Sequence, residues 1–98
     1  MDIQYATNRL NAAGLTLSQA TRFYGVSIGR KYIQRLAVIR AVVKFDDLYG
    51  HRALRLHTLQ GDRSGQYAMT LTGNFRLIIE RISDDTLRIL SVEDYHGD

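Results

Sequence analysis

The chain has 98 residues, of which 45% are hydrophobic and 23% charged. This composition is typical of a folded globular protein, and the length suits one domain over residues 1–98 with one modest core. It contains no cysteine, which excludes disulfides, thiolate nucleophiles and cysteine metal sites. The net charge of +3 is compatible with a polyanionic partner but does not identify one.

Neither a membrane span nor a secretory signal is visible. No stretch reaches the apolar length that a span needs. The amino end, residues 1–4, lacks a basic region followed by an apolar run. We therefore expect a cytoplasmic protein with no membrane partner.

The first half of the chain predicts helices after a short opening strand at residues 3–6. Gly14 interrupts the pattern. Ser18 is a predicted N-cap for a helix over residues 19–24, which Gly25 ends.

A longer helix is predicted over residues 26–43. Its apolar side chains recur at spacings of three and four, which is typical of one buried face: Ile28, Tyr32, Leu36, Ile39 and Val43. Lys31 and Arg35 lie one turn apart on another face. They are candidates for RNA contact, although charge on a helix is more often only a solvated flank.

The pattern changes to period two after Gly50, which predicts a strand over residues 54–59. The glycine-bracketed turn 61–65 links it to a strand over residues 66–72. Further strands are predicted at 75–82 and 87–95.

The hairpin between the second and third of these strands carries a register prediction. A two-residue turn at Gly73-Asn74 would pair Leu71 with Arg76. Cross-strand partners share a face, so Arg76 would lie beside Tyr67 and Met69.

Candidate chemical groups occur in four places: His57, Arg63 within the turn, Arg76 within an apolar strand, and Glu93-Asp94-Tyr95-His96 near the carboxyl end. Each has an ordinary alternative explanation, such as a structural histidine, a frayed terminus or an Arg76–Glu80 pair. The turn does not have the sequence of a phosphate-binding P-loop. Metal ligation by His57, Asp94 and His96 stays open, although no helical spacing supports it.

Taken together, three ordered motifs resemble the HigB-type toxins of the RelE/ParE superfamily. The motifs are Leu-His-Thr-Leu-Gln-Gly-Asp-Arg-Ser-Gly at 56–65, Gly-Asn-Phe-Arg at 73–76, and Asp-Tyr-His at 94–96. The resemblance covers nearly the whole chain. The resemblance implies an α+β fold with N-terminal helices packed on one face of a small, mainly antiparallel sheet.

Two positions depart from the family pattern. Thr58 replaces the usual proline, and Gln60 replaces a usual lysine that contributes to phosphate binding. Gln60 remains a candidate RNA contact, but more of the charge would fall to Arg63 and Arg76. Gly97-Asp98 extends the chain beyond the usual terminal histidine.

The resemblance implies a metal-independent endoribonuclease that needs no cofactor and uses the RNA 2′-hydroxyl as nucleophile. Histidine suits proton transfer because its ordinary pKa lies near working pH. His57 and His96 are the natural acid–base pair, in either order, and Asp94 would orient a histidine or act as base. Arg63 and Arg76 would stabilise the phosphorane, and Tyr95 would stack on a base.

The implied partners are messenger RNA in the ribosomal A site and a cognate helix-turn-helix antitoxin of the HigA type. Operator DNA would be bound only through the antitoxin complex. Two alternatives stay open: a ParE-like toxin that inhibits gyrase without nuclease chemistry, and a degenerate member that keeps only antitoxin or RNA binding.

Overall fold

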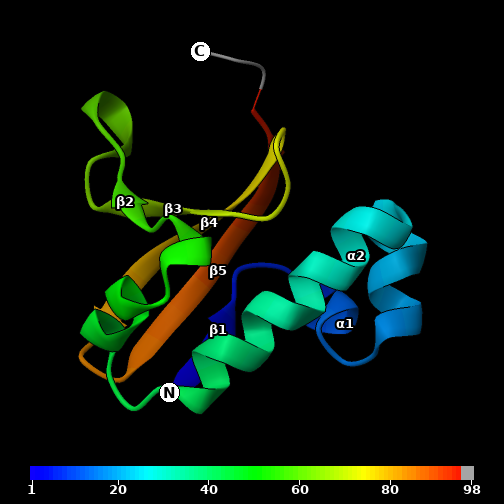
Figure 1. The fold of residues 1–98 in the computed structure, drawn as a ribbon, viewed down its shortest axis with the longest axis horizontal. Helices are drawn as coiled ribbons and strands as arrows, with labels where there is room; N and C mark the ends of the chain where they lie inside the picture. Colours follow the sequence, from blue (N-terminus) through cyan, green and yellow to red (C-terminus); the bar gives the residue numbers. More distant parts are fainter. Residues whose placement is uncertain (96–98) are drawn as a thin grey trace.

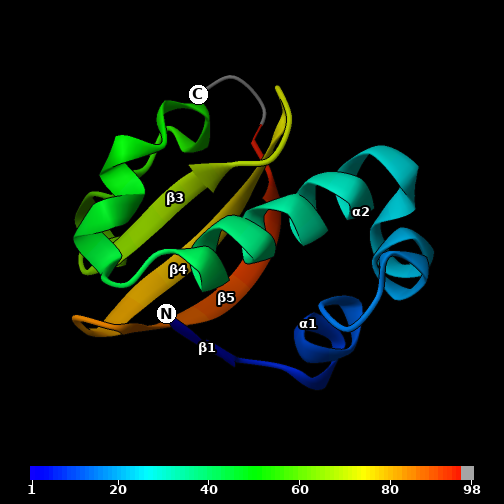
Figure 2. The ribbon, with the colours of Figure 1, turned by 60° about the horizontal axis from the view of Figure 1, so that its bottom comes forward.

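A computed structural model describes residues 1–95, in which two helices pack on one face of a five-stranded sheet (Figures 1 and 2). The strand order is β1-β5-β4-β3-β2, with β1 parallel to β5 and every other pair antiparallel. The predicted α+β class is confirmed. In chain order the helices and strands are β1 (Asp2–Tyr5), α1 (Asn8–Ala13), α2 (Leu17–Ala41), β2 (His57–Thr58), β3 (Gln66–Thr70), β4 (Phe75–Ser83) and β5 (Thr86–Asp94).

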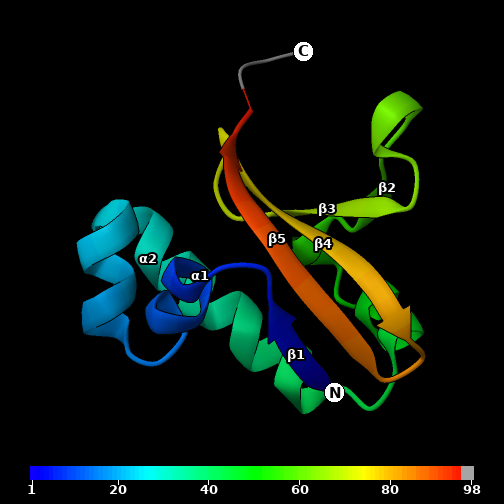
Figure 3. The ribbon, with the colours of Figure 1, turned by 180° about the vertical axis from the view of Figure 1, so that it is seen from behind.

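Three short 3-10 helices complete the fold: η1 (Phe45–Gly50), η2 (Arg52–Leu54) and η3 (Gly61–Arg63). Seen from behind, β4 and β5 are not covered by a helix (Figure 3). The described residues include no helix with the length and apolar character needed to cross a bilayer.

The amino-terminal helices are capped by threonines. The hydroxyl of Thr7 accepts a hydrogen bond from the Leu10 amide at 3.1 Å, which starts the short helix α1 that the sequence did not predict. Thr16 caps α2 in the same way, through the Gln19 amide at 3.1 Å. The prediction of Ser18 as the cap was therefore wrong by two residues, because Thr16 has the extended backbone that a cap requires.

Two glycines explain the shape of α2. Gly25 has a φ of 83°, which breaks the helix where the sequence predicted a stop. Gly29 lies against the helical segment that precedes Gly25, since a Cβ there would meet backbone atoms of Ala20 and Thr21 at 2.7 Å. The second segment ends at Ala41, so Val43 lies outside the helix and is 72% exposed instead of buried.

The core lies between α2 and the sheet. Tyr32, Leu36 and Ile39, the central members of the predicted helical face, are fully buried. They pack with sheet residues and with η1 and η2 in one cluster that includes Phe45, Leu48, Leu54, Met69, Leu71, Leu77, Ile79, Leu87 and Ile89. Tyr32 satisfies its buried hydroxyl by donating to the Leu10 carbonyl at 2.7 Å.

The predicted strand at 54–59 was mostly wrong. Only His57 and Thr58 form β2, while Leu54 ends η2 with its side chain in the core. Arg55 adopts the left-handed conformation, with φ 51° and ψ 44°, and turns the chain between the two elements. Alternating side chains here reflect a bend instead of an extended strand.

The predicted hairpin register was wrong by one residue. The structure pairs Thr70 with Arg76 and Ala68 with Ile78. The amides of Leu71 and Thr72 both donate to the Phe75 carbonyl, so the connection is longer than two residues.

A slip of one residue moves a side chain to the other face of a sheet. Arg76 therefore shares its face with Ala68 and Thr70, not with Tyr67 and Met69. This face is opposite the helix-covered core, to which Met69 belongs.

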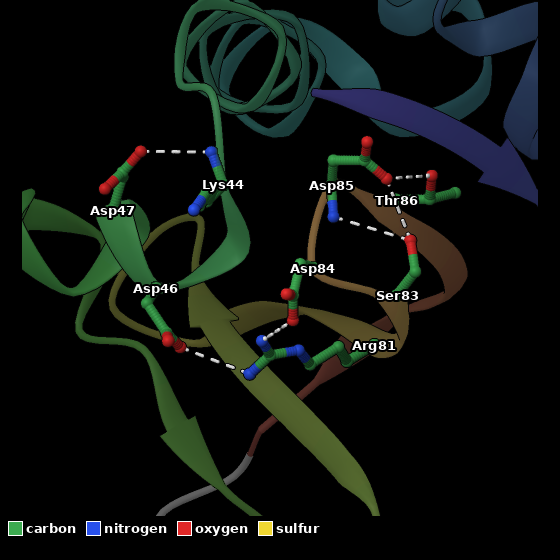
Figure 4. A network of polar contacts seen from close by, with 8 residues as sticks. All are labelled: Lys44, Asp46, Asp47, Arg81, Ser83, Asp84, Asp85 and Thr86. Atoms are coloured by element: carbon green, nitrogen blue, oxygen red, sulfur yellow. Dashed lines mark hydrogen bonds and ion pairs between the residues drawn. The ribbon is translucent and has the colours of Figure 1, made fainter.

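A polar network links η1 to the turn between β4 and β5 (Figure 4). Arg81 donates to Asp46 at 3.2 Å and to Asp84 at 2.6 Å. Asp47 accepts from the Lys44 amide at 3.0 Å. Asp85 accepts from the Ser83 hydroxyl at 2.9 Å. These contacts lie at the end of the β4–β5 hairpin away from Arg76.

Candidate functional site

An open cleft of about 510 Å³ lies beside β2, the β3–β4 connection and the end of β5. These segments lie at one edge of the molecule, at the top of Figure 1. The lining residues come from positions far apart in the sequence: Arg55, Leu56, His57, Thr70, Thr72, Gly73, Phe75, Arg76 and Tyr95. The fold thus brings together three of the predicted site residues, namely His57, Arg76 and Tyr95.

His57 presents one ring nitrogen for proton transfer. Its Nδ1 lies 2.8 Å from the carbonyl oxygen of Arg55. A carbonyl can only accept, so Nδ1 carries the proton and donates this bond. In the neutral ring Nε2 then holds a lone pair, and the side chain is exposed along the cleft. This tautomer leaves Nε2 able to accept a proton.

Arg76 is the most enclosed cation of the cleft. Its guanidinium lies 4.1 Å from the centre of the Tyr95 ring, and its Nη2 lies 3.8 Å from a Glu93 carboxylate oxygen. The side chain is 19% exposed. Its Nε is buried and has no hydrogen-bond partner among the described residues. A buried donor without a partner is unfavourable for the fold, so packing alone does not explain an arginine at this position.

Arg63 faces a carboxylate instead of the cleft. Its Nη1 and Nη2 donate to the two oxygens of Glu93 at 2.8 and 2.5 Å, and its Nε donates to Gln66 at 3.1 Å. Ser91 donates to the same carboxylate at 2.8 Å. The Arg63 bond, followed by that of Ser91, lowers the pKa of Glu93 against the opposing effect of burial. The bond also raises the pKa of Arg63.

Glu93 was part of the predicted terminal cluster but received no role. Its position beside the arginines could be recognised only from the strand pairing, in which Glu93 on β5 lies opposite Arg76 on β4. It lies between two arginines that come from different parts of the chain. The structure therefore adds Glu93 to the site as the group that holds Arg63.

Replacing Glu93 by glutamine should make stability less dependent on pH. A carboxyl with a lowered folded-state pKa stabilises the fold above its unfolded value, 4.5, and this contribution is lost as pH falls. We expect the wild-type protein to melt at a higher temperature than Glu93→Gln at pH 7. The difference should shrink towards pH 3. Because both side chains are about one third exposed, the effect should be at most about 1 kcal/mol.

Thermal melts of the two proteins between pH 3 and pH 7 test this. Asp62→Asn is the matched control, since Asp62 lies in the same turn, is exposed and forms no ion pair within the described residues. A difference in melting temperature that stays constant over the pH range would contradict the prediction.

The predicted RNA-contacting residues are not part of the cleft lining. Gln60 is exposed and precedes η3. Lys31 lies on α2 beside a shallow groove with Val26 and Arg30. Arg35 donates to the Thr70 carbonyl at 2.8 Å and to the Ala53 carbonyl at 3.5 Å, so its charge supports the end of β3.

The carboxyl-terminal motif is described only in part. Asp94 is exposed at the end of β5, where it pairs with Phe75. His96 lies outside the described residues. Over residues 1–95, no three histidine, aspartate or glutamate side chains gather in a group that could hold a metal ion.

Comparison with known proteins finds sequence and structural similarity to bacterial toxins. No family model matches the chain. Endoribonuclease HigB of Proteus vulgaris is 36% identical over 62 residues, which are 63% of this chain and 65% of that protein. The match thus spans slightly less than two thirds of the relative.

Solved structures match over almost the full length. The YoeB–YefM complex of Staphylococcus aureus has a TM-score of 0.64 at 17% identity, covering 98% of this chain and 97% of the other. The YoeB/ParE toxin of Agrobacterium tumefaciens has a TM-score of 0.60 at 12% identity, covering 98% and 100%. YafQ of E. coli has a TM-score of 0.54 at 20% identity, covering 95% and 91%. The chain therefore has the fold of the YoeB, ParE and YafQ toxins, and these findings confirm its resemblance to the RelE/ParE toxin superfamily.

Proposed function

We propose that this protein is the toxin of a type II toxin–antitoxin system and that it cleaves messenger RNA on the ribosome. The observation that supports this most is the cleft in which His57, Arg76 and Tyr95 meet. It combines a histidine with an available ring nitrogen, a largely buried guanidinium and an aromatic face. Those are the groups needed for proton transfer, phosphate binding and base stacking. The sequence match to an endoribonuclease agrees with this chemistry.

The proposed reaction is an intramolecular transfer that needs no metal. Nε2 of His57 takes the proton of the ribose 2′-hydroxyl, whose oxygen attacks the adjacent phosphorus. The bond from phosphorus to the 5′-oxygen breaks, and that oxygen receives a proton from a group near the carboxyl end, for which Asp94, Tyr95 and His96 are the candidates. Arg76 stabilises the charge on the phosphorane oxygens. The products are a 2′,3′-cyclic phosphate and a 5′-hydroxyl.

The partners follow from the same proposal. A cleft this small can bind a flexible strand only weakly, so the ribosomal A site would present the message. This target places the protein in the cytoplasm. A cognate antitoxin of the helix-turn-helix, HigA-like type would keep the toxin inactive and carry it to operator DNA. One structural neighbour is the YoeB–YefM complex, which supports the existence of a protein partner.

A ribosome-bound message with one 2′-deoxy ribose at the cleavage position tests the chemistry. We expect cleavage of the all-ribose message, no cleavage at the deoxy position, and a 2′,3′-cyclic phosphate on the upstream product, because the nucleophile is part of the substrate. Activity should survive a chelator, provided that the ribosome complex is shown to remain intact. Gyrase supercoiling, measured beside it, should be unaffected.

Three outcomes would contradict the proposal. Efficient cutting at the deoxy position, or an upstream product with a free 3′-hydroxyl, would exclude the 2′-hydroxyl mechanism. Either result would also bring back metal ligation by His57, Asp94 and His96. Intact RNA together with blocked supercoiling would assign the chain to the gyrase inhibitors instead.

A further inference from the structure

We propose that Arg55 is a second phosphate-binding residue of the cleft, which holds the RNA backbone on the His57 side while Arg76 holds it on the Tyr95 side. This inference rests on the proposed RNA substrate. It adds a residue that belongs to none of the three motifs by which the chain resembles other toxins. Two features support it: the charges that line the cleft and the backbone conformation of Arg55.

Arg55 is a cation of the cleft without a carboxylate partner. Within residues 1–95, the cleft lining contains two arginines, Arg55 and Arg76, and no acidic residue. Arg76 has Glu93 at 3.8 Å, whereas no ion pair of Arg55 occurs within residues 1–95. Arg55 is also exposed to solvent. An unpaired guanidinium beside an acid-free cleft is a ready phosphate ligand, because its planar donors match phosphate geometry.

The other arginines near the cleft are already committed. Arg63 has its two terminal nitrogens on Glu93 and its Nε on Gln66. Arg35 donates to the carbonyls of Thr70 and Ala53. Neither lines the cleft. Arg55 is therefore the available second cation among the described residues.

The backbone of Arg55 supports the same conclusion. Over residues 1–95 it is the single non-glycine residue with a positive φ, at 51°. Glycine or asparagine would adopt this conformation with less strain. The conformation accompanies the contact between the Arg55 carbonyl and His57 Nδ1 at 2.8 Å. Strained backbone conformations are concentrated at functional sites, so an arginine that keeps one beside the cleft supports a function for its side chain.

One residue would thus serve two groups of the reaction. Its carbonyl sets the tautomer of His57, which any residue type can do through its backbone. Its guanidinium binds phosphate, which only a cationic side chain can do. Substitutions of Arg55 separate these two contributions, because they keep the carbonyl and change the side chain.

The test uses binding, so that it does not depend on cleavage. The probe is a fluorescent single-stranded RNA oligonucleotide with 2′-O-methyl riboses, which cannot supply the nucleophile, and its anisotropy is measured over a range of salt concentrations. The variants are Arg55→Gln, Arg55→Gly and Arg55→Lys. Arg52→Gln is the matched control, since Arg52 is exposed, lies three residues earlier and does not line the cleft.

We expect Arg55→Gln to bind the probe about 10-fold more weakly than the wild-type protein at low salt. The salt dependence of log Kd should fall in slope by about 0.7, the amount for one phosphate contact on a single strand. Arg55→Gly should show the same loss while folding normally, because glycine accepts the positive φ. Arg55→Lys should recover part of the affinity, and Arg52→Gln should behave like the wild-type protein.

The outcomes separate this inference from the proposed function. If the wild-type protein cleaves RNA but Arg55→Gln binds and cleaves like Arg52→Gln, the role of Arg55 is wrong and the function stands. If neither the wild-type protein nor any variant cleaves RNA but binding of the probe still depends on Arg55, the nuclease proposal fails and the phosphate-binding role of Arg55 stands. Absence of wild-type binding to the probe, or an equal loss in Arg52→Gln, would overturn the inference.

Discussion

Replacing His57 by asparagine should lower the rate of message cleavage by roughly 10²- to 10⁴-fold, the usual contribution of a general base. Asparagine keeps a donor for the Arg55 carbonyl, but its side chain cannot take up a proton as Nε2 does. The position is exposed, so the melting temperature should change little. Single-turnover cleavage of a ribosome-bound message, together with thermal melts, measures both quantities.

His51→Asn is the matched control for this experiment. His51 is also exposed, lies between η1 and η2, and does not line the cleft. It should cleave at the wild-type rate. A His57→Asn variant that is folded and keeps full activity would remove His57 from the proposed mechanism.

Replacing Arg76 by alanine should lower cleavage by roughly 10²- to 10³-fold, as the loss of one donor to a developing oxyanion does elsewhere. Arg76→Lys should also be impaired, because lysine keeps the charge but loses the bidentate fork. The contact with the Tyr95 ring is worth about 2 kcal/mol at a largely desolvated site. The lost oxyanion donor is worth roughly 2.7 to 4 kcal/mol, so the loss of function should exceed the loss of stability. Cleavage rates and chemical unfolding of the same preparations give the comparison.

Arg88→Ala is the control for a sheet arginine. Arg88 donates to Glu80 at 2.6 Å and to Gln4 at 2.8 Å, and it does not line the cleft. Its loss should affect stability alone. If Arg76→Ala unfolds the protein while Arg76→Lys keeps full activity, Arg76 is a structural partner of Glu93 and its assigned role is wrong.

The helical half shows what local patterns can predict. Tyr32, Leu36 and Ile39 are buried as their spacing required, because the spacing of three and four depends only on the geometry of one helix. Gly25 broke the helix as expected, through its own backbone freedom. Helix α1 escaped prediction because six residues are too few to show a period.

The sheet half shows where local patterns fail. The hairpin register depended on two amides sharing the Phe75 carbonyl, a detail of the connection that the Gly-Asn pair does not specify. The strand pattern at 54–59 arose because Leu54 points into the core from η2 before Arg55 turns the chain. Alternation of apolar residues does not distinguish these cases.

The sequence predicted which residues belong to the site better than it predicted which of them contact each other. His57, Arg76 and Tyr95 meet in the cleft. The pairing of Arg63 with Glu93, 30 positions apart, could not be predicted because it depends on where η3 lies relative to the end of β5. The same contact gives Arg63 a partner that neutralises the charge expected to face RNA. Asp94 and Tyr95 follow Glu93 directly in sequence, yet of these three only Tyr95 lines the cleft.

The polar network at the β4–β5 turn makes the charge distribution of the molecule asymmetric. Four carboxylates, Asp46, Asp47, Asp84 and Asp85, accompany two cations, Lys44 and Arg81, a net of −2 for the groups drawn in Figure 4. Arg76 lies towards the other end of the same hairpin, five residues before Arg81 along β4, or about 17 Å for an extended strand. If the substrate is RNA, as proposed, we expect these carboxylates to be repelled by it and the cleft arginines to be attracted, so that the cleft faces the RNA before contact. Salt screens this interaction beyond roughly 8 Å at physiological ionic strength, so the rate of association should fall as salt is added.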